Sequence, residues 1–303
     1  YRNKRSHFDG QDILEAGTAE VTGKANDGWL NRMLQQVPGL TGTTAYSVGL
    51  NQNAVLAGDA PVSDWSPDIN LKLSPQGERL LELVMHDDPL FQRASAQALE
   101  ILTSLSQTTD IDMGGEQLMM MDEGGGKKPG NRFITRLSNG PTGRIAEFTA
   151  NRLRGDARIA AFSLGGWDTH GGQKNNIERA LLTLSVAIMR LRQDLGPVWG
   201  KTTVIAMTEF GRTVRENGSG GTDHGTGGLS LFAGGAVRGG QVVTDWPGLN
   251  ESDLFARRDL MPTRDVRAFA GWAMRGLYGF DRTTIENAIF PGLQMGDDPG
   301  IIA

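Results

Sequence analysis

Short apolar segments alternate with amphipathic segments from about residue 140 onward, and this alternation constrains the fold more than any other feature of the sequence. Residues 158–164 (RIAAFSL) and 202–208 (TTVIAMT) each predict a short buried strand that ends at polar or glycine residues. Between them, residues 176–195 place apolar side chains at helical spacing, and Gly196-Pro197 ends the helix. Strands that alternate with helices in this way predict an α/β protein built on a parallel sheet with crossover helices.

The same signals predict further elements on both sides of this region. They are helices over residues 75–84, 89–105 and 144–153, a strand over 229–233, and a last helix capped by Thr263. Residues 108–130 lack any sustained periodicity and predict an exposed loop. The opening residues YRNKRSH show neither a signal peptide nor a helix start, so we expect sequence upstream of Tyr1 to be missing. We expect one α/β domain over residues 1–303, with a helical and loop insertion at about 68–140.

Composition and charge exclude several classes of protein. The net charge is -5 and the 30 Lys and Arg residues are spread along the chain, so there is no basic stripe to bind nucleic acid. No run of about 18 apolar residues is present, so no transmembrane segment is expected. The chain has no Cys, which excludes disulfides, thiolate metal ligands and a Cys nucleophile.

Glycine-flanked polar loops follow the two best predicted strands. The loop GGWDTHGG after the first strand carries Asp168 and His170, and EFGRT after the second carries Glu209 and Arg212. Ligands of open α/β sheets gather outside the carboxyl ends of strands. We therefore expect these four side chains to share one crevice.

A third glycine loop, GTDHGTGG, carries Asp223 and His224 and precedes the strand at 229–233, so it must fold back to join that crevice. Imidazole nitrogen together with carboxylate oxygen is a ligand set for Zn, Mn or Fe. Zn is the ion expected first, with Mn, Fe, Mg and Ca as further candidates. The alternative is that each Asp–His pair caps its own loop, with a carboxylate that merely orients an imidazole. The predicted metal ligands are Asp168, His170, Glu209, Asp223 and His224.

Three further residues, Arg212, Ser6 and His7, are candidates for catalysis or substrate binding. Arg212 stands three positions after Glu209, where its guanidinium can hold an anionic oxygen bidentately or form a salt bridge to Glu209 or Glu216. Ser6 and His7 lie in the segment SHFDGQD and are candidates for ligands or substrate contacts.

At these motifs the chain resembles the exported bacterial proteins grouped as domain of unknown function 1501, which are called sulfatase-like and placed in the alkaline phosphatase superfamily. The matching segments span nearly the whole sequence in order. They are RSHFDGQD (5–12), GWLNR (28–32), SLGGWDTH (163–170), TEFGRT (208–213), GTDHG (221–225) and DWPG (245–248).

The resemblance implies an alkaline-phosphatase-like, doubly wound α/β sandwich with a helical insertion, which hydrolyses phosphate or sulfate esters. It also implies export by the twin-arginine route to the periplasm or outside the cell. In the superfamily, two metal ions about 4 Å apart clamp the oxygens of a small anionic ester. By position, Asp168, His170 and His224 resemble the ligands of one ion, and Glu209 resembles a replacement for an aspartate ligand. Phe210 stands where the superfamily has a histidine.

The resemblance also predicts an N-terminal part that this sequence does not contain. We expect the first strand or strands, and the nucleophile, to lie upstream of Tyr1. The sequence has no Cys and no Ser-x-Pro-x-Arg motif, so the formylglycine chemistry of true sulfatases cannot reside in it. Two other functions stay open, a non-catalytic exported binding or assembly protein that retains the fold, and a phosphomutase. The oligomeric state is not predicted.

Overall fold

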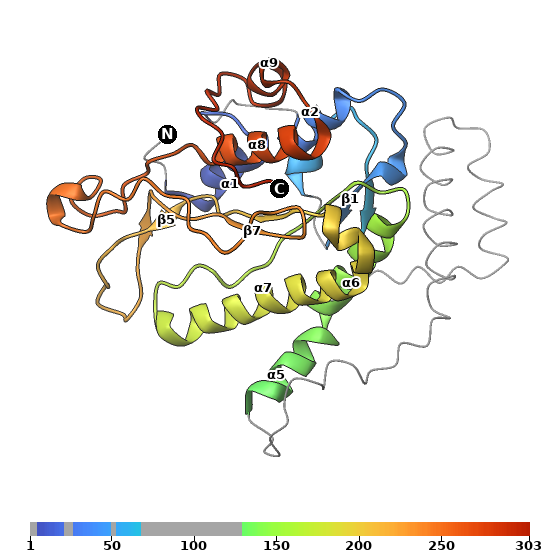
Figure 1. Cartoon of the computed structure of the whole chain (residues 1–303). Helices are drawn as coiled ribbons and strands as arrows, with labels where there is room; N and C mark the ends of the chain where they lie inside the picture. Colours follow the sequence, from blue (N-terminus) through green and yellow to red (C-terminus); the bar gives the residue numbers. More distant parts are fainter. Residues whose placement is uncertain (1–4, 21–26, 50–52, 68–128) are drawn as a thin grey trace, which may run out of the picture. The chain divides into compact units, whose positions relative to one another are not determined.

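The computed structural model describes residues 5–20, 27–49, 53–67 and 129–303 (Figure 1). By its internal contacts the chain divides into two compact units, one formed by Tyr1–Ser66 with Arg136–Ala303 and the other by Pro67–Thr135. The first unit contains every residue that the sequence analysis selected for chemistry. The expected single domain with an insertion stays a prediction.

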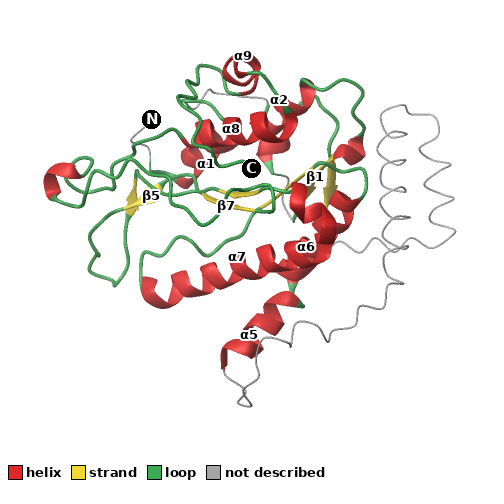
Figure 2. Cartoon of the chain, in the orientation of Figure 1, coloured by secondary structure: helices red, strands yellow, loops and turns green. Residues whose placement is uncertain are grey.

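Three short strands form a parallel sheet in the order β2-β1-β3, and Figure 2 labels the central strand β1. They are β1 (Ala45–Val48), β2 (Ser63–Trp65) and β3 (Ile159–Phe162). β3 confirms the strand predicted over residues 158–164, and its parallel pairing with β1 confirms the α/β class. The sequence analysis missed β1 and β2, because their sequences AYSV and SDW contain polar residues and form no apolar run.

Two antiparallel strand pairs follow later in the chain. β4 (Val204–Ala206) pairs with β7 (Leu231–Ala233), and β5 (Gly211–Arg212) pairs with β6 (His224–Gly225). The strands predicted near residues 202–208 and 229–233 are confirmed, but within the described residues they pair with each other and not with the parallel sheet. The chain between them turns back through β5 and β6, so β7 returns beside β4 in the opposite direction. The doubly wound, alkaline-phosphatase-like arrangement stays a prediction.

The described part also contains helices and short helical turns (Figures 1 and 2). Two of them confirm the helices predicted over residues 144–153 and 176–195, whereas those predicted over 75–84 and 89–105 lie outside the described residues. The helices of the described part are α1 (His7–Ala16), α2 (Trp29–Gln35), α5 (Pro129–Ser138), α6 (Pro141–Arg154), α7 (Gln173–Leu195), α8 (Val266–Tyr278) and α9 (Arg282–Thr284). Short 3-10 or π-helical turns lie at Gly42–Thr44, Ala54–Leu56, Gly196–Lys201, Glu251–Asp253 and Ile285–Ile289.

Three helix starts differ from the predictions. α1 begins directly after Ser6, where the sequence showed no helix start. α8 is capped by Asp265 and not by Thr263, because the Asp265 Oδ1 accepts a hydrogen bond of 2.9 Å from the Arg267 N–H. α5 begins before the predicted loop over residues 108–130 ends, and the rest of that loop lies outside the described residues.

Two hydrophobic clusters hold the first unit together. One cluster packs α2 and α8 against β1 and the turns that follow α9, through Met33, Leu34, Ala45, Met274, Ile289 and Phe290. The other joins α6 to α7 through Ala146, Ala150, Leu191 and Leu195. Burial of each Leu, Ile or Phe side chain contributes about 1.5–3 kcal/mol. These clusters fix the strands and helices from which the polar loops emerge.

A buried polar link anchors the loop that follows β3. The Asn53 side chain donates a hydrogen bond of 3.0 Å to the Ala161 carbonyl, and the Ser163 hydroxyl donates one of 3.1 Å to the Asn53 Oδ1. The loop that carries Asp168 therefore starts from a fixed point. In the part of the chain that the structure describes, no helix combines the length and the apolar character needed to cross a bilayer.

Candidate metal centre

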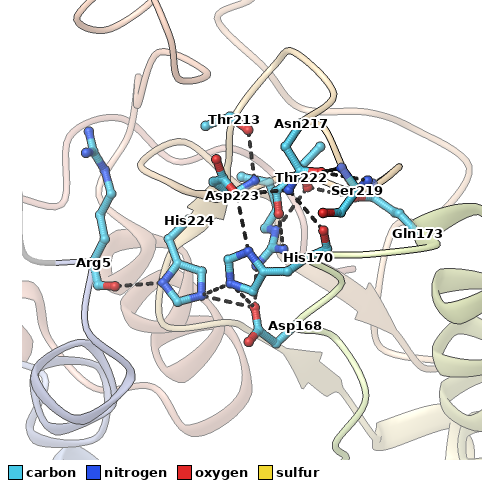
Figure 3. Close-up of polar contacts among 12 residues, drawn as sticks. Arg5, Asp168, His170, Gln173, Thr213, Asn217, Ser219, Thr222, Asp223 and His224 are labelled. Atoms are coloured by element: carbon cyan, nitrogen blue, oxygen red, sulfur yellow. Dashed lines mark hydrogen bonds and ion pairs between the residues drawn. The ribbon is translucent and has the colours of Figure 1, made fainter.

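Side chains from widely separated parts of the sequence meet in one cluster. Asp168 and His170 come from the loop after β3, His224 stands in β6, and His7 is the first residue of α1. Figure 3 shows Asp168, His170 and His224 pointing toward one another. The third glycine loop folds back to join the cluster, because β5 pairs with β6 and this pairing sets Arg212 opposite His224.

Two glycines permit this pairing. A Cβ atom on Gly225 would lie 2.4 Å from the Arg212 carbonyl, and one on Gly211 would lie 1.6 Å from the Gly227 oxygen. Real Cβ atoms do not approach backbone so closely, so only glycine allows the strands to come together here.

Three ligand-type atoms form a nearly equilateral triangle at the centre of the cluster. The Asp168 Oδ1 lies 3.1 Å from the His170 Nε2 and 3.0 Å from the His224 Nε2, and the two Nε2 atoms are 2.9 Å apart. Metal–ligand bonds of about 2.1 Å place neighbouring ligand atoms roughly 3.0–3.4 Å apart in octahedral or tetrahedral sites. The edges of the triangle are therefore close to those of a coordination site.

His7 adds a fourth group beside this triangle. Its Nε2 lies 3.2 Å from the Asp168 Oδ2, and ligand atoms of His7, Asp168 and His224 all lie within 4.8 Å of one another. The Asp168 side chain is 42% exposed, so a solute can reach the cluster from solvent.

Each of the three imidazoles presents its other nitrogen, Nδ1, to an oxygen acceptor. His7 faces the Glu209 Oε1 at 2.6 Å, and His224 faces the Arg5 carbonyl oxygen at 2.7 Å. His170 faces the Asp223 Oδ1 at 3.3 Å. Because a carbonyl or an ionised carboxylate only accepts hydrogen bonds, Nδ1 carries the proton and a neutral ring keeps a lone pair on Nε2. All three lone pairs are thus directed toward the Asp168 carboxylate.

Electrostatics keep this carboxylate ionised. Partial burial by itself raises the pKa of Asp168, but the hydrogen bond that Arg212 donates, together with the close His224 and His7 side chains, outweighs it, and the net pKa is far below the ordinary 3.8. The hydrogen bond to Glu209 raises the pKa of His7 above its ordinary 6.5, against a smaller opposing effect of burial. Asp168 is therefore a negatively charged carboxylate in contact with the three imidazole Nε2 atoms.

Arg212 is committed to contacts within the protein. Its Nη1 donates to the Asp168 Oδ1 at 2.6 Å, its Nε donates to the Thr222 hydroxyl at 3.0 Å, and its Nη2 donates to the Thr222 carbonyl. Its ion pair is thus with Asp168, and not with the Glu209 or Glu216 that the sequence spacing offered. The guanidinium holds the Asp168 carboxylate against β6.

Asn217 is a site residue that the sequence analysis missed. Its Nδ2 donates hydrogen bonds of 2.9 Å to both the Asp223 Oδ1 and the His170 carbonyl, and its Oδ1 accepts from the N–H groups of Ser219 and Gly221 (Figure 3). The hydrogen bond from Asn217 is the main cause that lowers the pKa of Asp223. Asn217 thereby fixes the carboxylate that faces His170. The turn-forming sequence NGSGG was the only signal for it.

Phe210 and Ser6 contribute no metal ligand. The Phe210 ring packs against the His224 ring at 4.4 Å and the His7 ring at 5.0 Å between centroids, so it forms an apolar wall behind both imidazoles. Ser6 is exposed at the N-cap of α1, where its side chain makes no capping hydrogen bond, and within the described residues no contact joins it to the cluster. The structure therefore brings together every predicted site residue except Ser6.

Comparison with known proteins places the chain in a family whose function is not known. The model of the family described as "Protein of unknown function (DUF1501)" matches residues 3–274. No curated protein matches the sequence. No solved structure matches it either. Since the family model covers most of its length, the chain belongs to this family of proteins of unknown function.

Proposed function

We propose that this protein is a metal-dependent hydrolase of phosphate or sulfate esters, whose ion, zinc first, binds to Asp168, His170 and His224, with His7 as a fourth ligand. The observation that carries the proposal is the shared orientation of the imidazoles, each with Nδ1 on an oxygen acceptor and Nε2 on Asp168. Histidine ligands of metals usually have this arrangement, because an acceptor at the far nitrogen fixes the tautomer and raises the basicity of the ligand nitrogen.

The geometry of the triangle favours a cation over hydrogen bonds alone. The three edges measure 2.9, 3.0 and 3.1 Å, so the directions from one atom to the other two differ by roughly 60°. An N–H group on one atom can therefore point at only one of the other two. One pair of atoms would stay unsatisfied at close range. A cation attracts all three donors at once, so the residues present fit a metal ion.

The proposal gives each neighbouring group a role. Glu209, Asp223 and the Arg5 carbonyl orient the three imidazoles, and Arg212 holds Asp168 in position and ionised. Glu209 and Asp223, which the sequence offered as ligands, act in this proposal as orienting groups. A divalent ion bound here would supply Lewis acidity toward the phosphoryl or sulfuryl oxygens of a small anionic ester.

Export to the periplasm or the outside of the cell completes the proposal. Its support is the resemblance to exported sulfatase-like proteins of the alkaline phosphatase superfamily. Fractionation of cells that produce the full-length protein tests it, and recovery of the protein only in the cytoplasm would contradict it.

Metal content tests the centre directly. Purified protein is expected to contain about one equivalent of a divalent metal by mass spectrometry, and Asp168→Ala and His224→Ala are expected to lose most of it. Glu178→Ala, an exposed acidic residue on α7, is the matched control and should retain the metal. Wild-type protein that takes up no divalent metal, or site variants that retain it fully, would overturn the proposed centre.

Turnover is measured separately on nitrophenyl phosphate, a nitrophenyl phosphodiester and nitrophenyl sulfate. Hydrolysis by the metal-loaded wild type well above that of an Asp168→Ala/His224→Ala double variant is expected. A metal-loaded protein with no such excess would remove the hydrolase and leave the metal centre.

A second function, that of a non-catalytic exported binding or assembly protein, is favoured by Phe210. Its ring occupies the flank of His7 and His224 with a group that cannot bind a metal or transfer a proton. In this case the ion would have a structural role. The expected result is then full metal content without turnover, together with a lower melting temperature when the metal is removed by a chelator.

A further inference from the structure

A cavity of about 380 Å³ lies beside the candidate centre and shares Asp168 with it. One wall is the glycine turn of the loop after β3, with Gly165 and Gly166, and the other is one face of α7, with Asn176, Arg179 and Thr183. This volume falls within the range of roughly 300–1,000 Å³ in which proteins bind small molecules. The cavity therefore has room for a small organic ester beside the metal ligands.

Arg179, on the face of α7 that lines the cavity, is an uncommitted cation. The Asn176 amide donates to the Gly171 carbonyl at 2.9 Å, and the Thr183 hydroxyl donates to the Arg179 carbonyl at 2.9 Å. The Arg179 guanidinium, in contrast, has no hydrogen-bond or ion-pair partner in the part of the chain that the structure describes. It is exposed on the wall of the cavity and carries a full positive charge with free donors.

The opposite wall offers backbone donors. The N–H groups of Gly165 and Gly166 make no hydrogen bond to any described residue, although both residues line the cavity. Gly166 has φ of 94°, a conformation that favours glycine, and a Cβ atom on Gly165 would meet nothing within 4 Å. Free backbone N–H groups in a glycine turn, opposite an arginine, are a chemistry suited to the oxygens of an anion.

Arg179 and Arg212 differ in whether their guanidinium groups already have partners within the protein. The sequence offered Arg212 either for an anionic oxygen or for a salt bridge, and in the structure each of its three side-chain nitrogens donates to Asp168 or Thr222. We infer that the cavity beside Asp168 is the anion subsite, where Arg179 and the Gly165 and Gly166 N–H groups bind the oxyanion of a phosphate or sulfate ester. The identification of the ligand as an ester rests on the proposed function, whereas the binding of an oxyanion does not.

Binding of inorganic phosphate by calorimetry tests this inference, with both metal-free and metal-loaded protein. Wild type is expected to bind phosphate in both states, and Arg179→Ala to bind it about tenfold more weakly, since hydrogen bonds to charged groups contribute about that factor or more. Arg179→Lys should recover part of the loss, because the charge remains without the bidentate geometry. Arg192→Ala, exposed on the same helix, is the matched control and should bind as wild type does.

The outcomes separate the two proposals. Equal phosphate binding by wild type and Arg179→Ala, or none by wild type in either state, would overturn the anion subsite whatever the metal content. Loss of phosphate binding in Arg179→Ala with metal content unchanged supports it, even for a protein that turns no ester over. Absence of metal from wild type would overturn the proposed function, and phosphate binding by the metal-free protein would still decide the subsite.

Discussion

Asp259 forms an ion pair of 2.6 Å with Arg5, and the carbonyl group of the same Arg5 lies 2.7 Å from the His224 Nδ1. The Asp259 side chain is fully buried, and it also contacts Arg258 at 3.1 Å. The turn that presents it contains Ala256, with φ of 50°, and Arg257, with φ of 56°. Non-glycine residues in this left-handed region cost of the order of 1–2 kcal/mol each. A strained turn thus holds a buried carboxylate that fixes the orientation of a candidate metal ligand.

Replacement of this carboxylate should weaken both the fold and the centre. Asp259→Asn is expected to lower the free energy of unfolding by about 2 kcal/mol, because it leaves the Arg5 guanidinium without its counter-charge. It should also lower the affinity for the metal by about tenfold, since the Arg5 carbonyl loses its anchor. Urea unfolding and competition with a chelator measure the two effects. Asp245→Asn, in an exposed pair with Arg264, is the control, and an equal response of both variants would contradict the role of Asp259.

The Nδ1 acceptors should matter although they do not bind the ion. Glu209→Ala is expected to reduce metal affinity by about 10–100-fold, and Glu209→Gln by less, because the amide oxygen can still accept from His7. The ¹⁵N shifts of His7 in the variants report whether its Nδ1 keeps the proton. If Glu209→Ala retained wild-type affinity and an unchanged His7 tautomer, the orienting role of Glu209 would be wrong.

The close approach of β5 and β6 predicts a position that tolerates only glycine. Gly225→Ala is expected to lower the free energy of unfolding by about 3 kcal/mol, because its Cβ would lie 2.4 Å from the Arg212 backbone. Metal binding should be lost with it, since His224 is the neighbouring residue. Gly218→Ala, in the same loop with nothing within 4 Å of the added Cβ, should cost much less. Equal stability of the two variants would show that the strands do not pair in this way.

The cap of α8 predicts a pH-dependent contribution to stability. Burial raises the pKa of Asp265, but hydrogen bonds from Arg267 outweigh it, so the pKa in the folded state lies below the ordinary 3.8. The charged carboxylate therefore stabilises the fold fully above pH 3.8, and its contribution is lost as the pH falls through the lowered pKa.

Asp265→Asn tests this contribution, because Asn retains the capping acceptor and loses only the charge. The melting temperature of Asp265→Asn should be below that of wild type at pH 7, and the difference should shrink on acidification below the ordinary pKa. Asp265→Ala should lose about a further 1 kcal/mol at all pH values, because the cap itself is gone. A difference between wild type and Asp265→Asn that did not change with pH would contradict the assignment.

Long periodic segments and the short strands that lie in apolar runs were predictable from the sequence, whereas the short strands that contain polar residues were not. α7 carries apolar residues at helical spacing from Ile177 to Leu195 and ends before Gly196 as predicted. β1 has only four residues, all buried, and its strand character depends on parallel partners that are distant in sequence. The same limit explains the antiparallel pairing of β4 with β7, which is set by the path of the intervening chain.

The candidate centre was predictable in its side chains and not in its hydrogen bonds. Glycine loops after predicted strands pointed to Asp168 and His170, and the Asp–His sequence pointed to His224. The acceptor of His224 is a backbone carbonyl at Arg5, for which no side-chain identity gives a signal. The ion pair of Arg212 with Asp168 likewise depends on the register of β5 and β6, which spacing along the sequence does not encode.

The residues of the cluster are far apart in the sequence, so the cluster can form only after the chain between them has folded. Its contacts join His7 to Glu209, 202 positions away, and Arg5 to His224, 219 positions away. No local segment can assemble it, because closing such long loops costs entropy before any contact repays it. An ion held there would link the first residues of this unit to its C-terminal half, so metal uptake would report that the unit has folded.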